Sequence, residues 1–207
     1  MSDGPVQRQH AARMPRAERV ETILEAARAA FTEKGFDATT VAGIATRIDV
    51  VEGTIYKYFD SKRDLLLAVL ARWYEALLAS GRTALREADT PRAGLLALVR
   101  LHLQAIHDDP PLCRLMFREV RGERDYEGSV LHRQNQRYTG LLADVLRDGM
   151  TQGHFRADLP VALLRDTVYG GIEHHSWSFL FGRGRALQVG LLAEQITDLV
   201  CRGIEPR

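Results

Sequence analysis

Apolar residues recur at intervals of three and four along most of the chain, and this period constrains the fold more than any other feature. Val20, Ile23, Leu24, Ala27 and Phe31 form the first such set, and their spacing places them on one face of a helix. A half-buried strand would instead alternate apolar and polar residues, and the sequence shows no sustained alternation of this kind. We therefore predict an all-α fold of about nine helices.

Charge alone does not indicate a nucleic-acid partner. The net charge of the chain is +1, and residues 1–62 contain nine Arg and Lys against nine Asp and Glu. A protein of this composition that binds DNA must therefore place its basic groups locally.

Residues 39–58 combine two short helical patterns with a tight turn. Thr40 is a suitable N-cap for the first helix, and Asp49 occupies the turn, where a residue that tolerates left-handed geometry is useful. The second helix, expected at 51–58, carries small polar and aromatic side chains that suit phosphates and base edges better than a core. The pattern predicts a DNA-binding helix-turn-helix, with Thr40, Gly53, Thr54, Tyr56, Lys57, Tyr58 and Lys62 as contact residues.

Helix boundaries divide the rest of the chain. The first helix is expected to run from Arg16 to Gly35, and a capping-box pair at Ser61 and Asp64 begins a helix over 62–80. A later helix is expected over 126–150, and two apolar helices follow Pro160. We predict a flexible arm over 1–15, a DNA-binding domain over 16–62 and a ligand-binding and dimerisation domain over 63–207.

Short motifs between Ile23 and Leu70 occur in a fixed order. They are Ile23-Leu24-Glu25-Ala26-Ala27, Phe31 through Gly35-Phe36, Thr39-Thr40-Val41, Ile44-Ala45, Gly53-Thr54-Ile55-Tyr56, and Tyr58-Phe59 through Ser61-Lys62 to Leu65-Leu66. Together they resemble the DNA-binding domain of the tetracycline-repressor (TetR) family. Asp49 replaces the family's usual Gly in the turn, while Gly43 and Val51-Glu52 stand where polar or charged residues are frequent.

The resemblance implies a homodimer that pairs through its last two helices, binds a palindromic double-stranded operator and is released by a small ligand. Activation in place of repression stays open, because the position of the operator decides it. A helical module that uses the same hairpin to bind a protein is the alternative.

Polar and aromatic residues on otherwise apolar helical faces are candidates for ligand binding. They are His102, Phe117, Tyr138, Tyr169, Glu173 and Trp177. A pocket with such a lining suits an apolar ligand that has a polar end. The alternative is that these residues are core or interface residues. The stretch 169–177, together with 50–59, also resembles fatty-acid-responsive members of the family that bind acyl-CoA.

Three arginines, Arg114, Arg118 and Arg121, are spaced to share a helix face and could bind an anion, although nearby acidic residues favour a salt-bridged surface. No enzyme motif is present. Adjacent His174 and His175 point about 100° apart on a helix, and HExxH spacing is absent. We expect no catalytic residue, metal or cofactor.

The two cysteines and the longest apolar run bear on where the protein works. Cys113 and Cys201 lie far apart in apolar helical patterns, so we expect buried thiols in a reducing cytoplasm. The longest apolar run, 65–71, is too short to cross a bilayer, so we expect no membrane partner.

Overall fold

The computed structural model describes residues 15–182 and 186–206, and within these residues the chain forms helices and no strands. The helices are α1 (Arg16–Ala38), α2 (Val41–Arg47), α3 (Glu52–Ile55), α4 (Lys62–Arg86), α5 (Pro91–Asp108), α6 (Pro110–Glu119), α7 (Val130–Thr151), α8 (Val161–Phe181) and α9 (Val189–Ile204). The prediction of an all-α fold of about nine helices is confirmed for this part of the chain. The predicted arm over 1–15 lies, apart from Pro15, outside the described residues.

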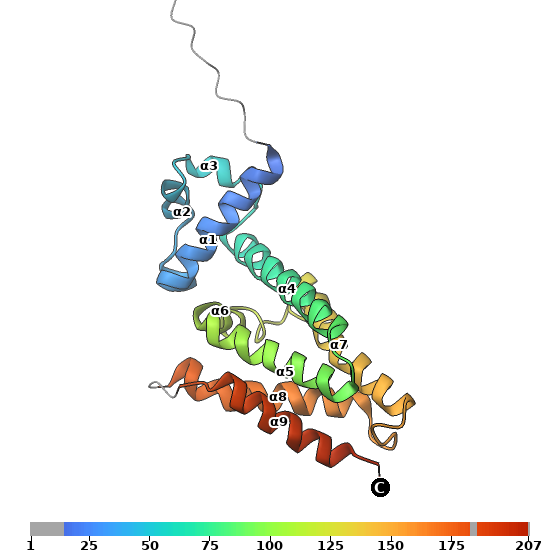
Figure 1. The fold of residues 1–207 in the computed structure, drawn as a ribbon. Coiled ribbons are helices and arrows are strands. Elements are labelled where there is room, and N and C mark those ends of the chain that lie inside the picture. Colours follow the sequence, from blue (N-terminus) through green and yellow to red (C-terminus); the bar gives the residue numbers. More distant parts are fainter. Residues whose placement is uncertain (1–14, 183–185, 207) are drawn as a thin grey trace, which may run out of the picture.

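Helices α1 to α3 gather at one end of the molecule, and α4 runs from them to the remaining helices (Figure 1). Helix α4 packs against α1 on one side and against α5 and α7 on the other. Helix α5 is the centre of the larger group, because it contacts α4, α6, α7, α8 and α9. A single long helix therefore connects the helix-turn-helix with the core of the C-terminal helices.

A backbone break at Gly35 ends the regular part of α1, as the sequence predicts. Gly35 has φ of 81° and ψ of 172°, a conformation that residues with a Cβ rarely adopt. The buried Thr39 stabilises the bend, because its hydroxyl donates to the carbonyls of Ala30 (3.1 Å) and Gly35 (2.7 Å). The break turns the chain towards α2.

Three helix boundaries differ from the sequence prediction. Helix α3 ends at Ile55, so residues 56–58 form a turn in place of the end of a helix over 51–58. Helix α4 continues beyond residue 80, because Gly81 packs where a Cβ would lie 2.7 Å from Leu141 of α7. Helix α7 begins at Val130 in place of residue 126, where Ser129 accepts a hydrogen bond from the His132 amide.

Both cysteines are buried free thiols, as the sequence predicts. Burial raises the pKa of Cys113 to about 12, so its thiol stays protonated at neutral pH. Among the described residues, no helix combines the length and the apolar character that a membrane span needs.

Candidate DNA-binding and effector sites

The helix-turn-helix is held by a cap, a strained turn residue and one buried anchor. The hydroxyl of Thr40 accepts a hydrogen bond from the Gly43 amide (3.1 Å) and caps α2. Asp49 has φ of 52°, so it adopts the left-handed conformation at a turn position where Gly is more common. Ile55 of α3 is 1% exposed and fixes that short helix against the core. Within residues 15–182 and 186–206, these contacts leave the opposite side of α3 exposed.

That free side carries most of the predicted DNA contacts. Gly53, Tyr56 and Lys57 are exposed, and Thr54 is partly exposed. A Cβ at Gly53 would meet no atom of the described residues within 4 Å, so the backbone there is open to a close approach. Tyr58 is partly buried against the core, with the Arg16 guanidinium 5.1 Å from the centre of its ring.

Lys62 has a structural role that the sequence reasoning missed. Its ammonium group donates to the carbonyls of Phe36 (2.8 Å) and Thr39 (2.9 Å), and it lies 4.3 Å from the centre of the Phe36 ring. The Phe36 carbonyl also accepts from the Thr39 amide (3.3 Å), so Lys62 adds to the hydrogen bonding that ends α1. A phosphate contact by Lys62 therefore requires these hydrogen bonds to be given up.

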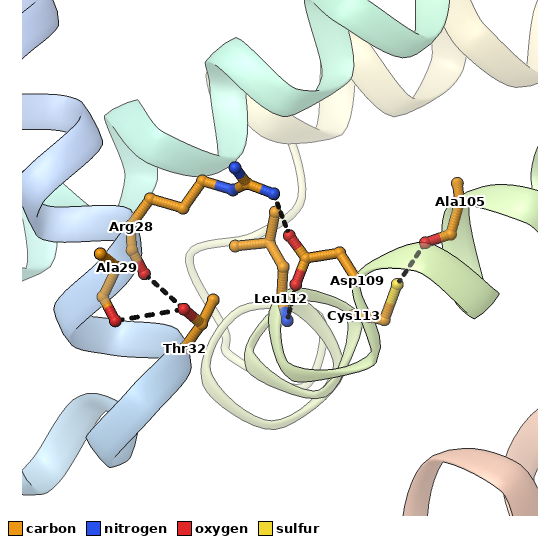
Figure 2. A network of polar contacts seen from close by, with 7 residues as sticks. All are labelled: Arg28, Ala29, Thr32, Ala105, Asp109, Leu112 and Cys113. Carbon is orange, nitrogen blue, oxygen red and sulfur yellow. Dashed lines mark hydrogen bonds and ion pairs between the residues drawn. The ribbon is translucent and has the colours of Figure 1, made fainter.

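Two arginines connect the DNA-binding helices with α6. Arg63, at the start of α4, donates to the carbonyl of Glu119 (3.1 Å) and to the carboxylate of Asp125 (3.1 Å). Arg28 of α1 pairs with Asp109, the residue that precedes α6, at 2.5 Å (Figure 2). The second carboxylate oxygen of Asp109 accepts from the Leu112 amide and caps α6. Asp109 therefore caps one helix and binds the side chain of another.

A small, partly open cavity lies among the C-terminal helices. Its volume is about 30 Å³, room for one or two water molecules. Its walls come from α4, α5, α6, α7 and α8. Trp73 of α4 lines this cavity and also an open cleft of about 800 Å³ between α1, α4 and the start of α6. A ligand of ordinary size must therefore move side chains apart to enter the cavity.

Polar pairs occupy much of the cavity wall. Arg121 and Glu173 form an ion pair at 2.6 Å, with only 27% and 22% of their side chains exposed. The Tyr74 hydroxyl donates to the Asn135 side-chain oxygen at 3.3 Å. The Arg121 guanidinium also lies 5.3 Å from the centre of the Phe117 ring. This lining suits an amphipathic ligand better than a purely apolar one.

Aromatic rings pack beside these pairs. The rings of His102 and Tyr138 stack with centroids 5.8 Å apart, and Tyr169 meets His102 edge-on at 4.8 Å. Burial raises the pKa of Tyr74, Tyr138 and Tyr169 far above the ordinary range, so their hydroxyls stay protonated. Burial, assisted by the nearby positive charge of Arg121, lowers the pKa of His102 to about 3. The imidazole is therefore neutral at pH 7.

The structure brings most of the predicted ligand-binding residues together. His102, Phe117, Tyr138 and Glu173 line the cavity. Tyr169 packs behind His102, while Trp177 is 52% exposed and contacts the ring of Phe117 with centroids 6.1 Å apart.

The predicted ligand-binding set did not include nine other lining residues: Trp73, Tyr74, Leu77, Ile106, Cys113, Met116, Arg121, Asn135 and Thr139. For the polar Asn135 and Thr139 a sequence signal existed, because they fall on the same stripe of α7 as the apolar Leu131 and Leu142.

The three arginines on α6 and in the following turn do not form one anion site. Arg121 pairs with Glu173, and Arg114 donates to the carbonyl of Leu180 (3.2 Å). Arg118 lies 5.1 Å from the centre of the Phe181 ring. Each guanidinium therefore has a separate environment.

Helices α8 and α9 leave apolar side chains exposed. Leu163 is 56% exposed, Leu191 is 56% exposed and Leu199 is 74% exposed. Gly170 and Gly171 of α8 are exposed, and a Cβ at either position would meet nothing within 4 Å. Such a surface matches the predicted dimer face through the last two helices.

Comparison with known proteins agrees with this architecture. The model for bacterial regulatory proteins of the tetR family matches residues 23–69, and the model for the tetracyclin repressor-like C-terminal domain matches residues 88–204. The HTH-type transcriptional repressor KstR2 of Rhodococcus jostii (strain RHA1) is 29% identical over 187 residues, which cover 88% of this chain and 89% of that repressor.

Two solved structures share the fold. The crystal structure of the transcriptional regulator FadR from Bacillus subtilis in complex with stearoyl-CoA has a TM-score of 0.77 at 22% identity and covers 89% of this chain and 99% of its own. The ketosteroid transcriptional regulator KstR2 of Mycobacterium tuberculosis has a TM-score of 0.64 at 24% identity, with 96% and 100% covered.

A helix-turn-helix joined by one long helix to a helical domain with a small internal cavity is the architecture of a ligand-responsive DNA-binding regulator. The C-terminal model spans more than half of the chain and the N-terminal model spans the helix-turn-helix, so the chain belongs to the TetR family. It is a transcriptional regulator that binds double-stranded operator DNA as a homodimer and responds to a small molecule.

Proposed function

We propose that the protein is a repressor that an acyl thioester, such as an acyl-CoA, releases from its operator. The observation that carries this proposal is the path of α4. Its first residue, Lys62, binds the carbonyls of Phe36 and Thr39 at the end of α1, while Trp73, Tyr74 and Leu77 of the same helix line the cavity. A ligand that opens the cavity must displace α4 side chains and so acts on the helix that supports the helix-turn-helix.

The relatives support the chemical class. FadR from Bacillus subtilis was crystallised with stearoyl-CoA, and the M. tuberculosis KstR2 is described as a ketosteroid regulator. In this chain the apolar part of an effector would lie against Leu77, Ile106 and Met116. Its polar end would then meet the Arg121–Glu173 pair, where a carbonyl or phosphate oxygen competes for the guanidinium.

We further propose that Gly53, Thr54, Tyr56 and Lys57 form the surface that faces the DNA. Their exposure, opposite the buried Ile55, supports this assignment. Each protomer presents one short helix, and a two-fold pair spaced about 34–36 Å apart reads two half-sites. The protein acts by binding, without catalysis, in the cytoplasm where operator DNA is found, and residues 63–207 carry the effector and dimer functions.

The test is operator binding measured by fluorescence anisotropy, with DNA that flanks the protein's own gene. The double variant Tyr56→Ala with Lys57→Ala should weaken binding at least about tenfold and reduce the salt dependence by roughly one counterion. Lys34→Ala is the matched control, because Lys34 is exposed beside α6 and away from α3. Full binding by the double variant would remove α3 as the reading helix and favour a protein partner for the hairpin.

Effector release is measured in the same assay. A series of acyl-CoA thioesters of increasing chain length, added to the protein–DNA complex, should lower the anisotropy at one range of lengths. Free CoA and the corresponding free acids are the controls, and they should release the protein poorly because each supplies only half of the contacts. Equal anisotropy across the whole series would refute the thioester proposal.

A further inference from the structure

Val51 is an exposed aliphatic residue directly before the short helix α3, and it is 75% exposed. The other aliphatic residues larger than Ala between positions 39 and 59 are buried or partly buried against the core: Val41, Ile44, Ile48, Val50 and Ile55. An isolated exposed Val is common on protein surfaces, so the position of Val51 decides what it means. Helix α3 lies at the end of the molecule away from α5 to α9, so none of these helices covers Val51 (Figure 1).

Neither burial nor capping explains a Val at this position. Val51 is the N-cap of α3, with φ of −79° and ψ of 148°, the extended backbone that a capping residue adopts. Its side chain has no atom that accepts a hydrogen bond, and it makes no capping bond. Helices α2 and α4, on either side of α3 in the chain, begin with Thr40 and Ser61, whose hydroxyls accept from backbone amides. A Ser or Thr would stabilise the start of α3 in the same way, so the stability of the fold gives no reason for Val.

The chemistry at the start of α3 suits base edges better than phosphates. Val51 is apolar, and the next residue, Glu52, is an exposed carboxylate that a phosphate repels. The first residues of a recognition helix are those that reach base edges in the major groove. Among the four bases only thymine presents a methyl group there, and an aliphatic side chain packs favourably against it.

We propose that Val51 is a specificity-determining residue that packs against the C5 methyl group of a thymine in each half-site of the operator. This inference rests on the proposed DNA-facing surface of α3 and adds the residue that precedes it. The polar residues of that surface supply hydrogen bonds and a positive charge, while Val51 supplies a preference for one T·A base pair.

The test removes single methyl groups from the operator. A consensus operator is selected from random duplexes with the wild-type protein, and each thymine is then replaced by deoxyuridine, which pairs with adenine but lacks the methyl group. Affinity is measured by fluorescence anisotropy at one fixed salt concentration. We expect a loss of about fourfold at one thymine of each half-site, and of about fifteenfold when both half-sites are substituted.

Variants of Val51 assign the methyl preference to this side chain. Val51→Ala should bind the thymine operator about as weakly as the wild type binds the deoxyuridine operator, and should lose no further affinity when the methyl group is removed. Val51→Ser separates DNA preference from stability, because a Ser at the N-cap should raise Tm by about 2–4 °C and still abolish the methyl preference. Val130→Ala is the matched control, since Val130 is 58% exposed at the start of α7 and should behave as the wild type when substituted.

Each other result overturns the inference. A selected half-site without thymine, or equal affinity after every deoxyuridine replacement, refutes the methyl contact while the proposed DNA-facing surface stands. A methyl preference that persists in Val51→Ala refutes the assignment to this residue, and a lower Tm for Val51→Ser gives Val51 a structural role instead. Failure of the wild type to select any duplex, or full binding by Tyr56→Ala with Lys57→Ala, refutes the proposed function itself and the inference with it.

Discussion

Asp109 combines two roles that substitution can separate. One carboxylate oxygen caps α6 through the Leu112 amide, and the other pairs with Arg28 of α1. Loss of an N-cap costs about 1 kcal/mol of the free energy of unfolding. The ion pair contributes about 0.5–1 kcal/mol, because Arg28 is 57% exposed while Asp109 is only 12% exposed. Asp109→Ala loses both, so we expect a destabilisation of about 1.5–2 kcal/mol, or roughly 3–8 °C in Tm.

Two matched variants isolate each role. Asp109→Asn keeps an effective cap and removes the charge, so it should lose only about 0.5–1 kcal/mol. Arg28→Ala should lower the free energy of unfolding by a similar amount. The double variant Asp109→Asn with Arg28→Ala should be no less stable than either single variant, because each single substitution already breaks the ion pair.

The assay is urea unfolding followed by circular dichroism at one fixed protein concentration, since dimerisation makes the midpoint concentration-dependent. High salt should reduce the free energy that the Arg28–Asp109 ion pair contributes and leave the contribution of the N-cap unchanged. If Asp109→Asn is as damaging as Asp109→Ala, the separation of the two roles is wrong.

Three further predictions concern packing, pH and the end of α1. Gly149→Ala should lower the free energy of unfolding by about 1–3 kcal/mol, because a Cβ there would lie 2.2 Å from the buried ring of Phe155. The control is Gly140→Ala on the same helix, where a Cβ would meet no described atom within 4 Å, so this variant should be neutral or stabilising. Thermal melts compare the two variants, and equal effects would contradict the packing. The pKa of His102 is about 3 in the folded state and 6.5 in the unfolded state. Below pH 6.5 the unfolded chain therefore binds a proton that the folded protein does not, so this contribution to stability is fully present above pH 6.5 and is lost as the pH falls towards 3. About 2 kcal/mol should be lost at pH 5, and urea unfolding at pH 7 and pH 5 should show a smaller loss for His102→Phe. Lys62→Met should destabilise the protein by about 2–3 kcal/mol, because the charge-assisted hydrogen bonds of Lys62 to two carbonyls are lost. A Tm equal to that of the wild type would show that Lys62 has no such structural role and would leave DNA contact as its only function.

Local patterns predicted the helix-turn-helix well because its chemistry is local. A cap at Thr40, a left-handed turn residue at Asp49 and a capping pair at Ser61 and Asp64 each act within four residues, so the sequence identifies them without knowledge of the fold. The true end of α4 depends instead on Gly81 packing against α7, a contact between distant parts of the chain. The predicted boundary at residue 80 was therefore too early.

Long side chains were harder to assign than helix boundaries. Lys62 and Arg63 are adjacent cations at the start of a helix, and the sequence analysis assigned Lys62 to DNA contact. In the structure Lys62 binds carbonyls 23 and 26 residues earlier, and Arg63 binds Asp125, 62 residues later. A flexible cation reaches whichever acceptor the fold brings near it, and sequence spacing carries no information about such an acceptor.

The sequence by itself determined the helical fold, the helix-turn-helix and the family, because helical period, caps and turn residues are encoded over short stretches. Tertiary structure alone decided which polar residues line the same cavity. Tyr74, His102, Asn135 and Glu173 come from four different helices and meet only when α4, α5, α7 and α8 pack together. Tertiary structure also left His102 Nε2 without a partner among the described residues, because a hydrogen bond depends on where two distant helices place their atoms to within a few tenths of an ångström.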